Sequence, residues 1–128
     1  MSLIVLDSHV VVWWASGSRP LGRRATVALR DAPRLGIPTI VFWEISLLVR
    51  KRRLDLGMPV REWAAKIQEI PRVEALPLTA DVALLADALD MHADPVDRFI
   101  VATAISHQVA LVSKDALLRR LGAVETVW

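Results

Sequence analysis

Four acidic residues have the types and the positions to share one chemical site. Asp7 directly follows the apolar run Leu-Ile-Val-Leu, and Asp115 follows Leu-Val-Ser-Lys. Glu44 interrupts the apolar segment Val-Phe-Trp-Glu-Ile-Ser-Leu-Leu, and Asp97 begins the segment Asp-Arg-Phe-Ile-Val-Ala-Thr-Ala. Carboxylates that converge raise one another's pKa values by repulsion, and a divalent cation relieves that repulsion. Oxygen-only ligands suit Mg²⁺ or Mn²⁺ rather than zinc, and such an ion can activate water for attack on a phosphodiester.

Most of these acids also have a purely structural explanation. Asp7, Asp94 and Asp115 are good helix N-cap residues, and Asp97 is favoured in a first helical turn by the helix macrodipole. Glu44 differs, because we expect it in the first turn of an apolar helix. A partly buried carboxylate there is costly unless a cation pairs with it, so Glu44 is either paired or functional. The positions of the acids after strands, taken together, favour a shared site.

The elements that must position these acids alternate along the chain. Short apolar runs predict buried strands at 3–6, 36–40, 73–76 and 109–113, with a fifth at 124–127. Amphipathic segments predict helices at 21–31, 42–54, 60–70, 80–89, 94–107 and 115–121. Strands separated by helices require crossover connections, which predicts an α/β fold with a parallel sheet of four to five strands and helices on both faces. Ligands of such sheets bind at the carboxyl ends of the strands.

Composition excludes several classes of protein. With 128 residues, 54% of them hydrophobic, the chain is long enough for one domain and too apolar to be disordered. It has no cysteine, which excludes disulfides, thiolate zinc sites and a cysteine nucleophile. No apolar segment approaches the roughly 20 residues of a membrane span, and the N-terminus lacks the basic region of a signal peptide. We expect a soluble cytoplasmic protein without a membrane segment.

The basic residues suggest an anionic partner. The formal net charge is +2, and setting aside the five acids named above leaves the rest of the chain at +7. The densest run of positive charge is Arg50, Lys51, Arg52 and Arg53. This run is explained equally well by a solvated helix end and by phosphate contacts that bind RNA beside the acidic site.

A resemblance to a known family is carried by three stretches, LIVLDSHVVVWW, TIVFWEISLLVRKRRLDL and LPLTADVALLADALDMHADPVDRFIVATAISHQVALVSKDALL. In this order they resemble the PIN-domain ribonucleases, of the kind found as the VapC toxin in bacterial and archaeal toxin–antitoxin pairs. The stretches cover most of the chain. The resemblance implies a single PIN-like domain over residues 1–128 and an acidic site that binds Mg²⁺ or Mn²⁺.

The resemblance also assigns site residues. It places the family's catalytic and metal-binding acids on Asp7, Glu44, Asp97 and Asp115. It gives auxiliary roles to Asp94, Ser8 and Ser113, the two serines because they stand where the family often has threonine.

The implied activity is hydrolysis of RNA phosphodiester bonds by metal-activated water. The implied partners are an RNA substrate, a cognate antitoxin protein that covers or approaches the site, and a second copy of the chain in a homodimer. This mechanism needs no histidine nucleophile, so we expect the three histidines, His9, His92 and His107, to be structural or exposed. We expect core positions for the tryptophans that lie among apolar residues, which are Trp13, Trp14, Trp43 and Trp63. The alternative for some of them is a dimer face or a groove for a partner helix.

Three alternatives remain open from the sequence. A catalytically weak PIN-like module would bind RNA or protein, but only loss of the acids would favour it. A magnesium-dependent phosphohydrolase with an aspartyl nucleophile usually has a second Asp two residues after the first, where this chain has His9. A receiver-like signalling module would need a phosphoacceptor Asp after a central strand, and no Asp directly follows 73–76.

Overall fold

Five parallel strands form the central sheet. The computed structural model describes residues 3–17 and 20–128. The strands are β1 (Leu3–Leu6), β2 (Arg34–Pro38), β3 (Val73–Leu76), β4 (Leu111–Val112) and β5 (Thr126–Val127). Their order across the sheet is β3-β2-β1-β4-β5, and every neighbouring pair is parallel. The predicted parallel α/β fold is therefore confirmed.

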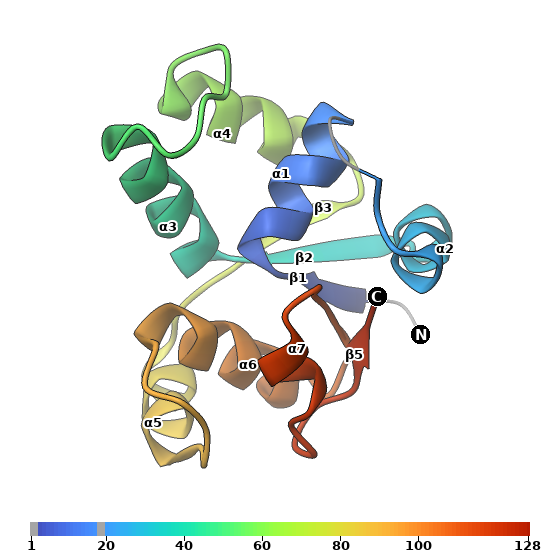
Figure 1. Cartoon of the computed structure of the whole chain (residues 1–128), viewed down its shortest axis with the longest axis vertical. Coiled ribbons are helices and arrows are strands. Elements are labelled where there is room, and N and C mark those ends of the chain that lie inside the picture. The colour runs from blue at the N-terminus through green and yellow to red at the C-terminus, as the bar shows by residue number, and fades with distance from the viewer. Residues whose placement is uncertain (1–2, 18–19) are drawn as a thin grey trace.

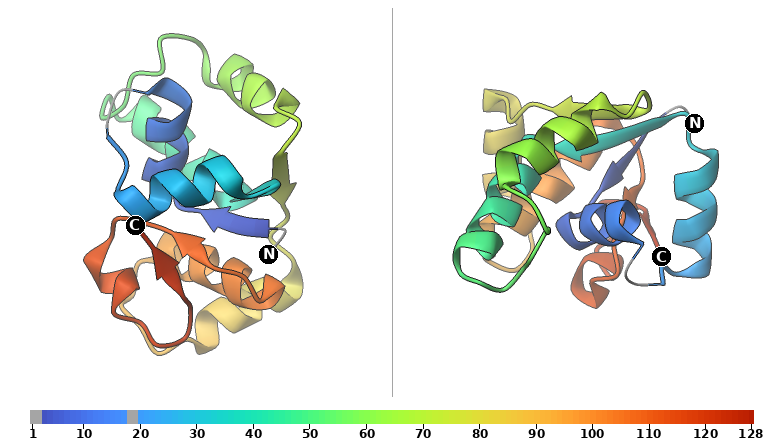
Figure 2. Two further views of the ribbon diagram at one scale, coloured as in Figure 1. Left: turned by 90° about the vertical axis from the view of Figure 1, so that its right-hand side faces the viewer. Right: turned by 90° about the horizontal axis from the view of Figure 1, so that it is seen from above.

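Helices cover both faces of this sheet. The seven helices found in the described residues are α1 (Ser8–Ser16), α2 (Arg23–Asp31), α3 (Thr39–Arg50), α4 (Val60–Glu69), α5 (Ala80–Ala88), α6 (Pro95–His107) and α7 (Ala116–Arg119). Helices α1, α3 and α4 lie on one side of the sheet, and α5 and α6 lie on the other (Figure 1). Helix α2 lies beside the C-terminal end of the chain, where Gly22 approaches Trp128 (Figure 2). All four residues of β1 are buried, as a strand covered on both faces requires.

The order of the strands reverses beside β1. The chain adds β2 and then β3 on one side of β1, and afterwards crosses to add β4 and β5 on the other side. Leu6 pairs with Val112, so β1 and β4 end at the same level. In open α/β sheets this reversal leaves a crevice beyond the carboxyl ends of the two strands, where ligands bind. Asp7 and Ser113 are the first residues beyond these two ends.

The boundaries of β2 and α3 differ from the prediction. We expected a strand at 36–40 and a helix from 42, but the strand ends at Pro38 and the helix begins at Thr39. Pro38 has φ −56° and ψ 136°, and it lacks the amide hydrogen that would extend the strand pairing. Glu44 consequently lies in the second turn of α3, not in the first.

The tryptophans are not all in the core. Trp63 is buried, whereas Trp43 is 54% exposed, so the core position expected for Trp43 is wrong. Val41 and Ile45, four residues apart on α3, are fully buried. Trp43 lies two residues from each of them, so the helical period turns it away from the sheet and into solvent.

Helix α6 packs along the sheet with a continuous apolar surface. Its residues Ile100, Val101 and Ala104 are fully buried. Asp94 caps its N-terminus by accepting from the amides of Val96 and Asp97. Along the described stretches 3–17 and 20–128, no helix combines the length and apolar character needed to cross a membrane.

Candidate active site

The predicted acids meet in a pocket at the point where the strand order reverses. The pocket has a volume of about 500 Å³. The residues that line it are Asp7, Ser8, His9, Trp13, Glu44, Leu48, Asp97, Lys114 and Asp115. All four carboxylates predicted as catalytic and metal-binding are thus brought together.

Asp7 is held by both neighbouring elements. It is only 4% exposed, and its amide donates to the carbonyl of Val112 at 3.1 Å. Its Oδ1 accepts from the amide of Ser8 at 2.8 Å, and its Oδ2 accepts from the hydroxyl of Ser113 at 2.6 Å. Asp7 is therefore both the N-cap of α1 and a fixed carboxylate at the pocket wall.

Ser113 connects two of the acids from behind the pocket wall. Its side chain is fully buried. The Ser113 hydroxyl donates to Asp7 and accepts from the amide of Asp115 at 3.1 Å. Asp115 in turn accepts from the amide of Leu117 at 2.8 Å, which makes it the N-cap of α7. The auxiliary role expected for Ser113 is thus consistent with its position.

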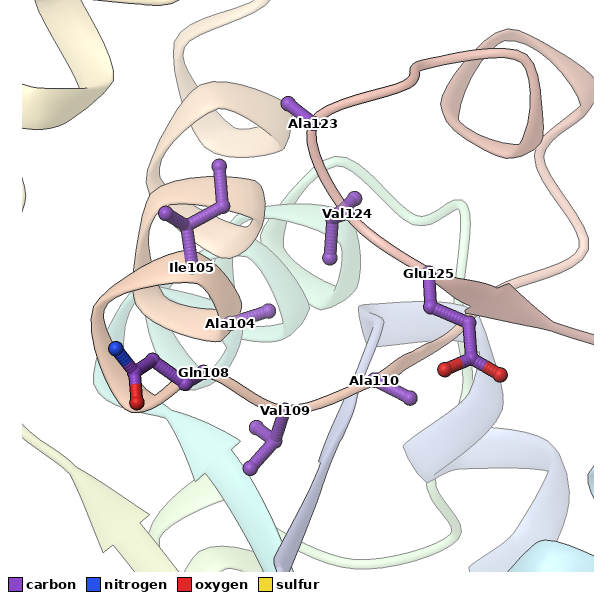
Figure 3. Close-up of a pocket in the computed structure, with 8 residues that line it drawn as sticks. All are labelled: Ala104, Ile105, Gln108, Val109, Ala110, Ala123, Val124 and Glu125. Carbon is purple, nitrogen blue, oxygen red and sulfur yellow. The ribbon is translucent and has the colours of Figure 1, made fainter.

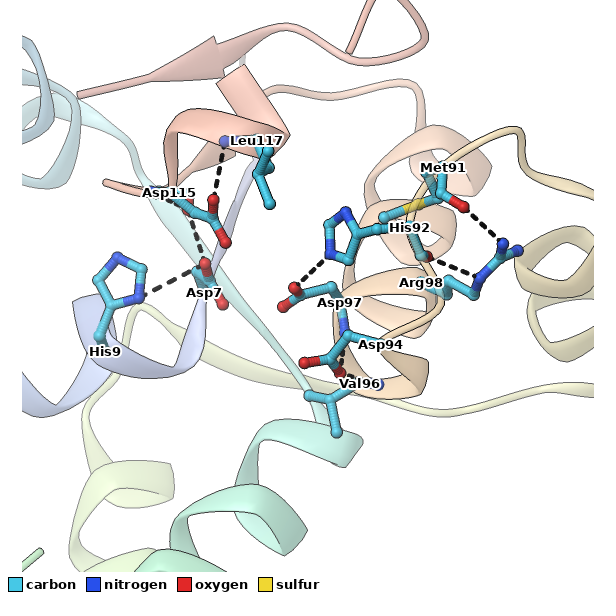
Figure 4. Close-up of polar contacts among 11 residues, drawn as sticks. Asp7, His9, Met91, His92, Asp94, Val96, Asp97, Arg98, Asp115 and Leu117 are labelled. Carbon is cyan, nitrogen blue, oxygen red and sulfur yellow. Dashed lines mark hydrogen bonds and ion pairs between the residues drawn. The ribbon is translucent and has the colours of Figure 1, made fainter. Parts of the chain in front are cut away.

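Asp97 enters from the other side of the pocket, in the first turn of α6. Its Oδ2 lies 2.8 Å from Nε2 of His92, and Figure 4 shows His92 beside it and the Asp97 carboxylate directed toward the Asp7 side of the site. Asp94 caps α6 one turn earlier and does not line the pocket itself. His92, which we expected to be structural or exposed, therefore orients a site carboxylate.

Arg98 organises the loop that carries His92. Its guanidinium donates to the carbonyl oxygens of Ala86, Leu89, Met91 and His92 at 2.7–3.0 Å, with a longer contact to Asp87. Arg98 thus ties the end of α5 and the following loop to the first turn of α6. The partners of Arg98 in the described residues are thus backbone carbonyl groups at the end of α5 and in the following loop.

Two of the pocket acids have perturbed proton affinities. Burial is the main cause that raises the pKa of Glu44, and the negative charges of Asp7, Asp97 and Asp94 add to it. The Ser8 hydroxyl partly offsets this increase. Burial also raises the pKa of Asp97, together with the neighbouring acids, while the hydrogen bond from His92 lowers it. The pocket therefore has a strong negative potential that favours a cation.

His9 forms part of the same wall. Its Nε2 accepts from the backbone amide of Lys114 at 3.0 Å, so its proton is on Nδ1, which lies 3.5 Å from Oδ2 of Asp7. Burial lowers the pKa of His9, although Asp7 and Asp115 act in the opposite direction. His9 is consequently a neutral imidazole that supports Asp7. No sequence pattern predicted this contact, because the amide of Lys114 is distant along the chain.

The chemistry of the pocket fits a hard divalent cation. Its acidic donors are carboxylate oxygens, the ligands that Mg²⁺ and Mn²⁺ prefer. The Ser8 hydroxyl is buried beside Glu44, but in the described part of the molecule it makes no hydrogen bond of normal geometry, so water on a hydrated cation would supply a well-placed partner. As they stand, no three acidic or histidine side chains within 3–17 and 20–128 are close enough to hold a metal ion. Binding thus requires side-chain rotation or bridging water, which Mg²⁺ usually retains.

The basic run lies outside this pocket. Arg50 is the last residue of α3, and Lys51 and Arg52 follow in a turn in which Arg52 has φ 59°. Arg52 and Arg53 line a separate hollow with Leu54 and Asp55. The run follows Leu48 of the pocket wall by two residues, so it borders the site without facing the acids.

Another hollow lies at the opposite edge of the sheet. It has a volume of about 310 Å³ and lies between the end of α6 and the residues that precede β4 and β5 (Figure 3). Apolar side chains such as Ile105, Val109 and Val124 line it, and among the described residues that line it Glu125 is the one carboxylate. It therefore lacks the set of groups that hydrolysis requires.

Comparison with known proteins agrees with the fold. The model of the PIN domain family matches residues 4–124. The chain is 37% identical to Ribonuclease VapC22 of Mycobacterium tuberculosis over the full length of both proteins. Among solved structures, the fold is similar to VapC20 of Mycobacterium tuberculosis, described as a Sarcin-Ricin loop cleaving toxin. That match has a TM-score of 0.71 and 19% identity, and covers 98% of this chain and 99% of the other. A toxin-antitoxin complex from Klebsiella pneumoniae matches with a TM-score of 0.67 and 18% identity over 94% of both chains.

Proposed function

Because this chain belongs to the PIN domain family, we propose that it is a metal-dependent endoribonuclease and the toxin of a toxin–antitoxin pair. The observation that carries this proposal is the convergence of Asp7, Glu44, Asp97 and Asp115 in one pocket at the carboxyl ends of β1 and β4. The full-length similarity to a ribonuclease supports RNA as the substrate class.

We propose that these four acids are the ligands of Mg²⁺ or Mn²⁺. When bound, such an ion lowers the pKa of water and stabilises charge on the phosphate. Asp7 presents a fixed orientation, since Ser8 and Ser113 occupy one lone pair on each of its oxygens. His92 performs the same role for Asp97. Burial and the neighbouring acids raise the pKa values of Glu44 and Asp97, and a cation in the pocket would act in the opposite direction on both.

The proposed reaction is hydrolysis. A water oxygen attacks the phosphorus of an RNA strand, one P–O ester bond breaks, and the leaving oxygen takes a proton. The buried position of Asp7 and the hydrogen bonds that orient Asp97 keep the carboxylates in place while charge develops on the phosphate. We further propose that Arg50, Lys51, Arg52 and Arg53 attract the RNA through its phosphates.

We propose two protein partners. The structural similarity to a toxin-antitoxin complex supports a cognate antitoxin. A homodimer is a second proposal, and the large exposed apolar side chains of Trp43, Leu84 and Leu117, each on a different helix, are candidates for burial by a protein partner. RNA and antitoxin would both be met in the cytoplasm, where we expect the chain to act.

Cleavage of labelled RNAs tests the proposed activity. Purified chain is incubated with Mg²⁺, Mn²⁺ or EDTA, and the variants are Asp7→Asn and Asp97→Asn. Asp87→Asn is the matched control, because Asp87 is exposed on α5 and does not line the pocket. We expect metal-dependent cleavage by wild type and by Asp87→Asn, and a loss of at least about 100-fold in both site variants. Cleavage that survives EDTA and both site substitutions would refute the proposal, and RNA binding without cleavage would favour a binding module.

A further inference from the structure

We infer that Lys114 binds the RNA backbone at the acidic pocket, through a phosphate next to the one that is cleaved. This inference deepens the proposed ribonuclease function and rests on it. Of the described residues that line the pocket, Lys114 is the only lysine or arginine, among four carboxylates. Its place between β4 and α7 puts it directly between Ser113 and Asp115.

Helix α1 holds Lys114 at two points. The Lys114 amide donates to Nε2 of His9 at 3.0 Å. Its ammonium lies over the Trp13 ring, 5.5 Å from the ring centroid. His9 and Trp13 are four residues apart on one face of α1, with ring centroids 4.9 Å apart. Backbone and side chain of Lys114 are therefore both placed by α1.

The C-terminal residue supports this arrangement. The Trp128 ring contacts Trp13 edge to face, with centroids 6.0 Å apart, and its centroid lies 6.3 Å from that of His9. The backbone of Trp128 packs so closely on Gly22 that a Cβ there would lie 2.6 Å from it. The surface under the Lys114 ammonium is thus a packed aromatic cluster of His9, Trp13 and Trp128.

The Lys114 ammonium is available to bind an anion from outside the protein. Within the described residues, it forms no ion pair within 4.0 Å of a carboxylate, although four carboxylates line the same pocket. Contact with an aromatic face stabilises a cation without neutralising it. An ammonium carries three hydrogen-bond donors, which suit phosphate oxygens.

The charge of the pocket explains why such a cation is needed. Four ionised carboxylates give the pocket a charge of −4, and one divalent ion together with Lys114 brings it to −1. Without Lys114 the same pocket would carry −2 and would repel an incoming phosphodiester more strongly. Arg50 and the basic residues that follow it lie outside the pocket and act only at longer range.

The test is direct RNA binding in a non-cleaving background. Lys114→Met is compared with Lys66→Met, a matched control on α4 whose ammonium pairs with the exposed Glu62. All variants carry Asp97→Asn and are measured in EDTA with a labelled single-stranded RNA over a range of salt concentrations. We expect Lys114→Met to weaken binding and to reduce the slope of log Kd against log salt by about 0.7, the value of one phosphate contact on a single strand. Lys66→Met should leave the slope unchanged.

A second set of variants separates the charge from its placement. Lys114→Arg should restore the salt slope. Trp13→Leu keeps the ammonium but removes the ring beneath it, so it should weaken binding with the slope retained, and Trp13→Phe should recover part of the affinity. In the active background, Lys114→Met should raise KM more than it lowers kcat.

The outcomes distinguish this inference from the proposed function. If wild type cleaves RNA while Lys114→Met keeps the wild-type Kd, salt slope and KM, the inference is overturned and the ribonuclease stands. If wild type cleaves no RNA but Lys114→Met reduces the slope, the binding role stands and the ribonuclease fails. Tm values measured for every variant identify any loss of affinity that comes from unfolding.

Discussion

Arg98 and Arg72 both donate hydrogen bonds to backbone carbonyls, but they lie at different distances from the acidic pocket. Replacing each in turn tests whether the loop that Arg98 holds is needed for metal binding. Arg98 donates to four carbonyl oxygens at 2.7–3.0 Å around the loop that carries His92. Arg72 donates to the carbonyls of Leu29, in the last turn of α2, and of Ala32, which follows that helix, both at 2.8 Å. Each guanidinium satisfies carbonyls in the last turn of a helix and just beyond it, but Arg98 also contacts the loop that carries His92 of the acidic site. We therefore compare Arg98→Met with Arg72→Met.

The expected losses of stability follow from these contacts. At about 1 kcal/mol net for each short hydrogen bond, and less where water can replace the donor, Arg98→Met should lower the free energy of unfolding by about 3 kcal/mol. Arg72→Met should lower it by about 2 kcal/mol. For a chain of this size each kcal/mol shifts Tm by about 4 °C, so we expect decreases of about 12 °C and 8 °C.

The two variants should differ much more in metal binding. Without Arg98, the carbonyls of Met91 and His92 lose their donor, so His92 no longer orients Asp97. Loss of a group that orients a ligand typically costs about 10-fold to 100-fold in metal affinity. Urea unfolding and Mn²⁺ titration, both performed below the melting transition, measure the two effects separately. Equal Mn²⁺ affinity in Arg98→Met and Arg72→Met would refute this reasoning.

Three further predictions concern the pocket and its support. The pKa values of the Glu44 and Asp97 carboxyl groups are raised, so the folded state binds a proton at each group more tightly than the unfolded state does. The contribution of both groups to the free energy of unfolding therefore falls as pH rises. Metal-free Glu44→Gln should therefore have a higher Tm than wild type at about pH 8, with the difference disappearing by about pH 4, and an unchanged difference would contradict the prediction. Ser113→Ala removes a buried partner of a carboxylate and should cost about 2–4 kcal/mol in urea unfolding, while Ser113→Thr should retain most of the stability. Gly22→Ala should displace Trp128, cost about 1–3 kcal/mol and change tryptophan fluorescence, and wild-type fluorescence and Tm would count against the packing described.

The parts of the site that could be predicted from the sequence are those that local patterns determine. Asp7 and Asp115 follow apolar runs, and the structure places both just beyond the ends of neighbouring strands. The same residues cap helices, so the structural and the functional explanations that the sequence offers are compatible. Asp94 and Asp97 likewise follow from the capping pattern that opens α6.

The parts that could not be predicted depend on contacts between distant segments. The carbonyl groups that accept from Arg98 belong to the loop after α5, which lies against the start of α6 only in the folded chain. The hydrogen bond between the Lys114 amide and His9 forms because β1 and β4 pair in register. The hydropathy pattern of the sequence does not predict which strands pair, so it could not predict this contact. Trp43 was expected in the core because its neighbours are apolar, but it lies two residues from the buried Val41 and Ile45, and the helical period turns it into solvent.

The most direct test of the central claim is the rate of RNA cleavage measured while Mn²⁺ is titrated into wild type and Asp97→Asn, with bound Mn²⁺ determined by EPR in the same samples. The account predicts that cleavage by wild type rises in parallel with Mn²⁺ occupancy, and that Asp97→Asn loses both at the same metal concentrations. Cleavage that proceeds without bound divalent ion, or at the wild-type rate in Asp97→Asn, would contradict it.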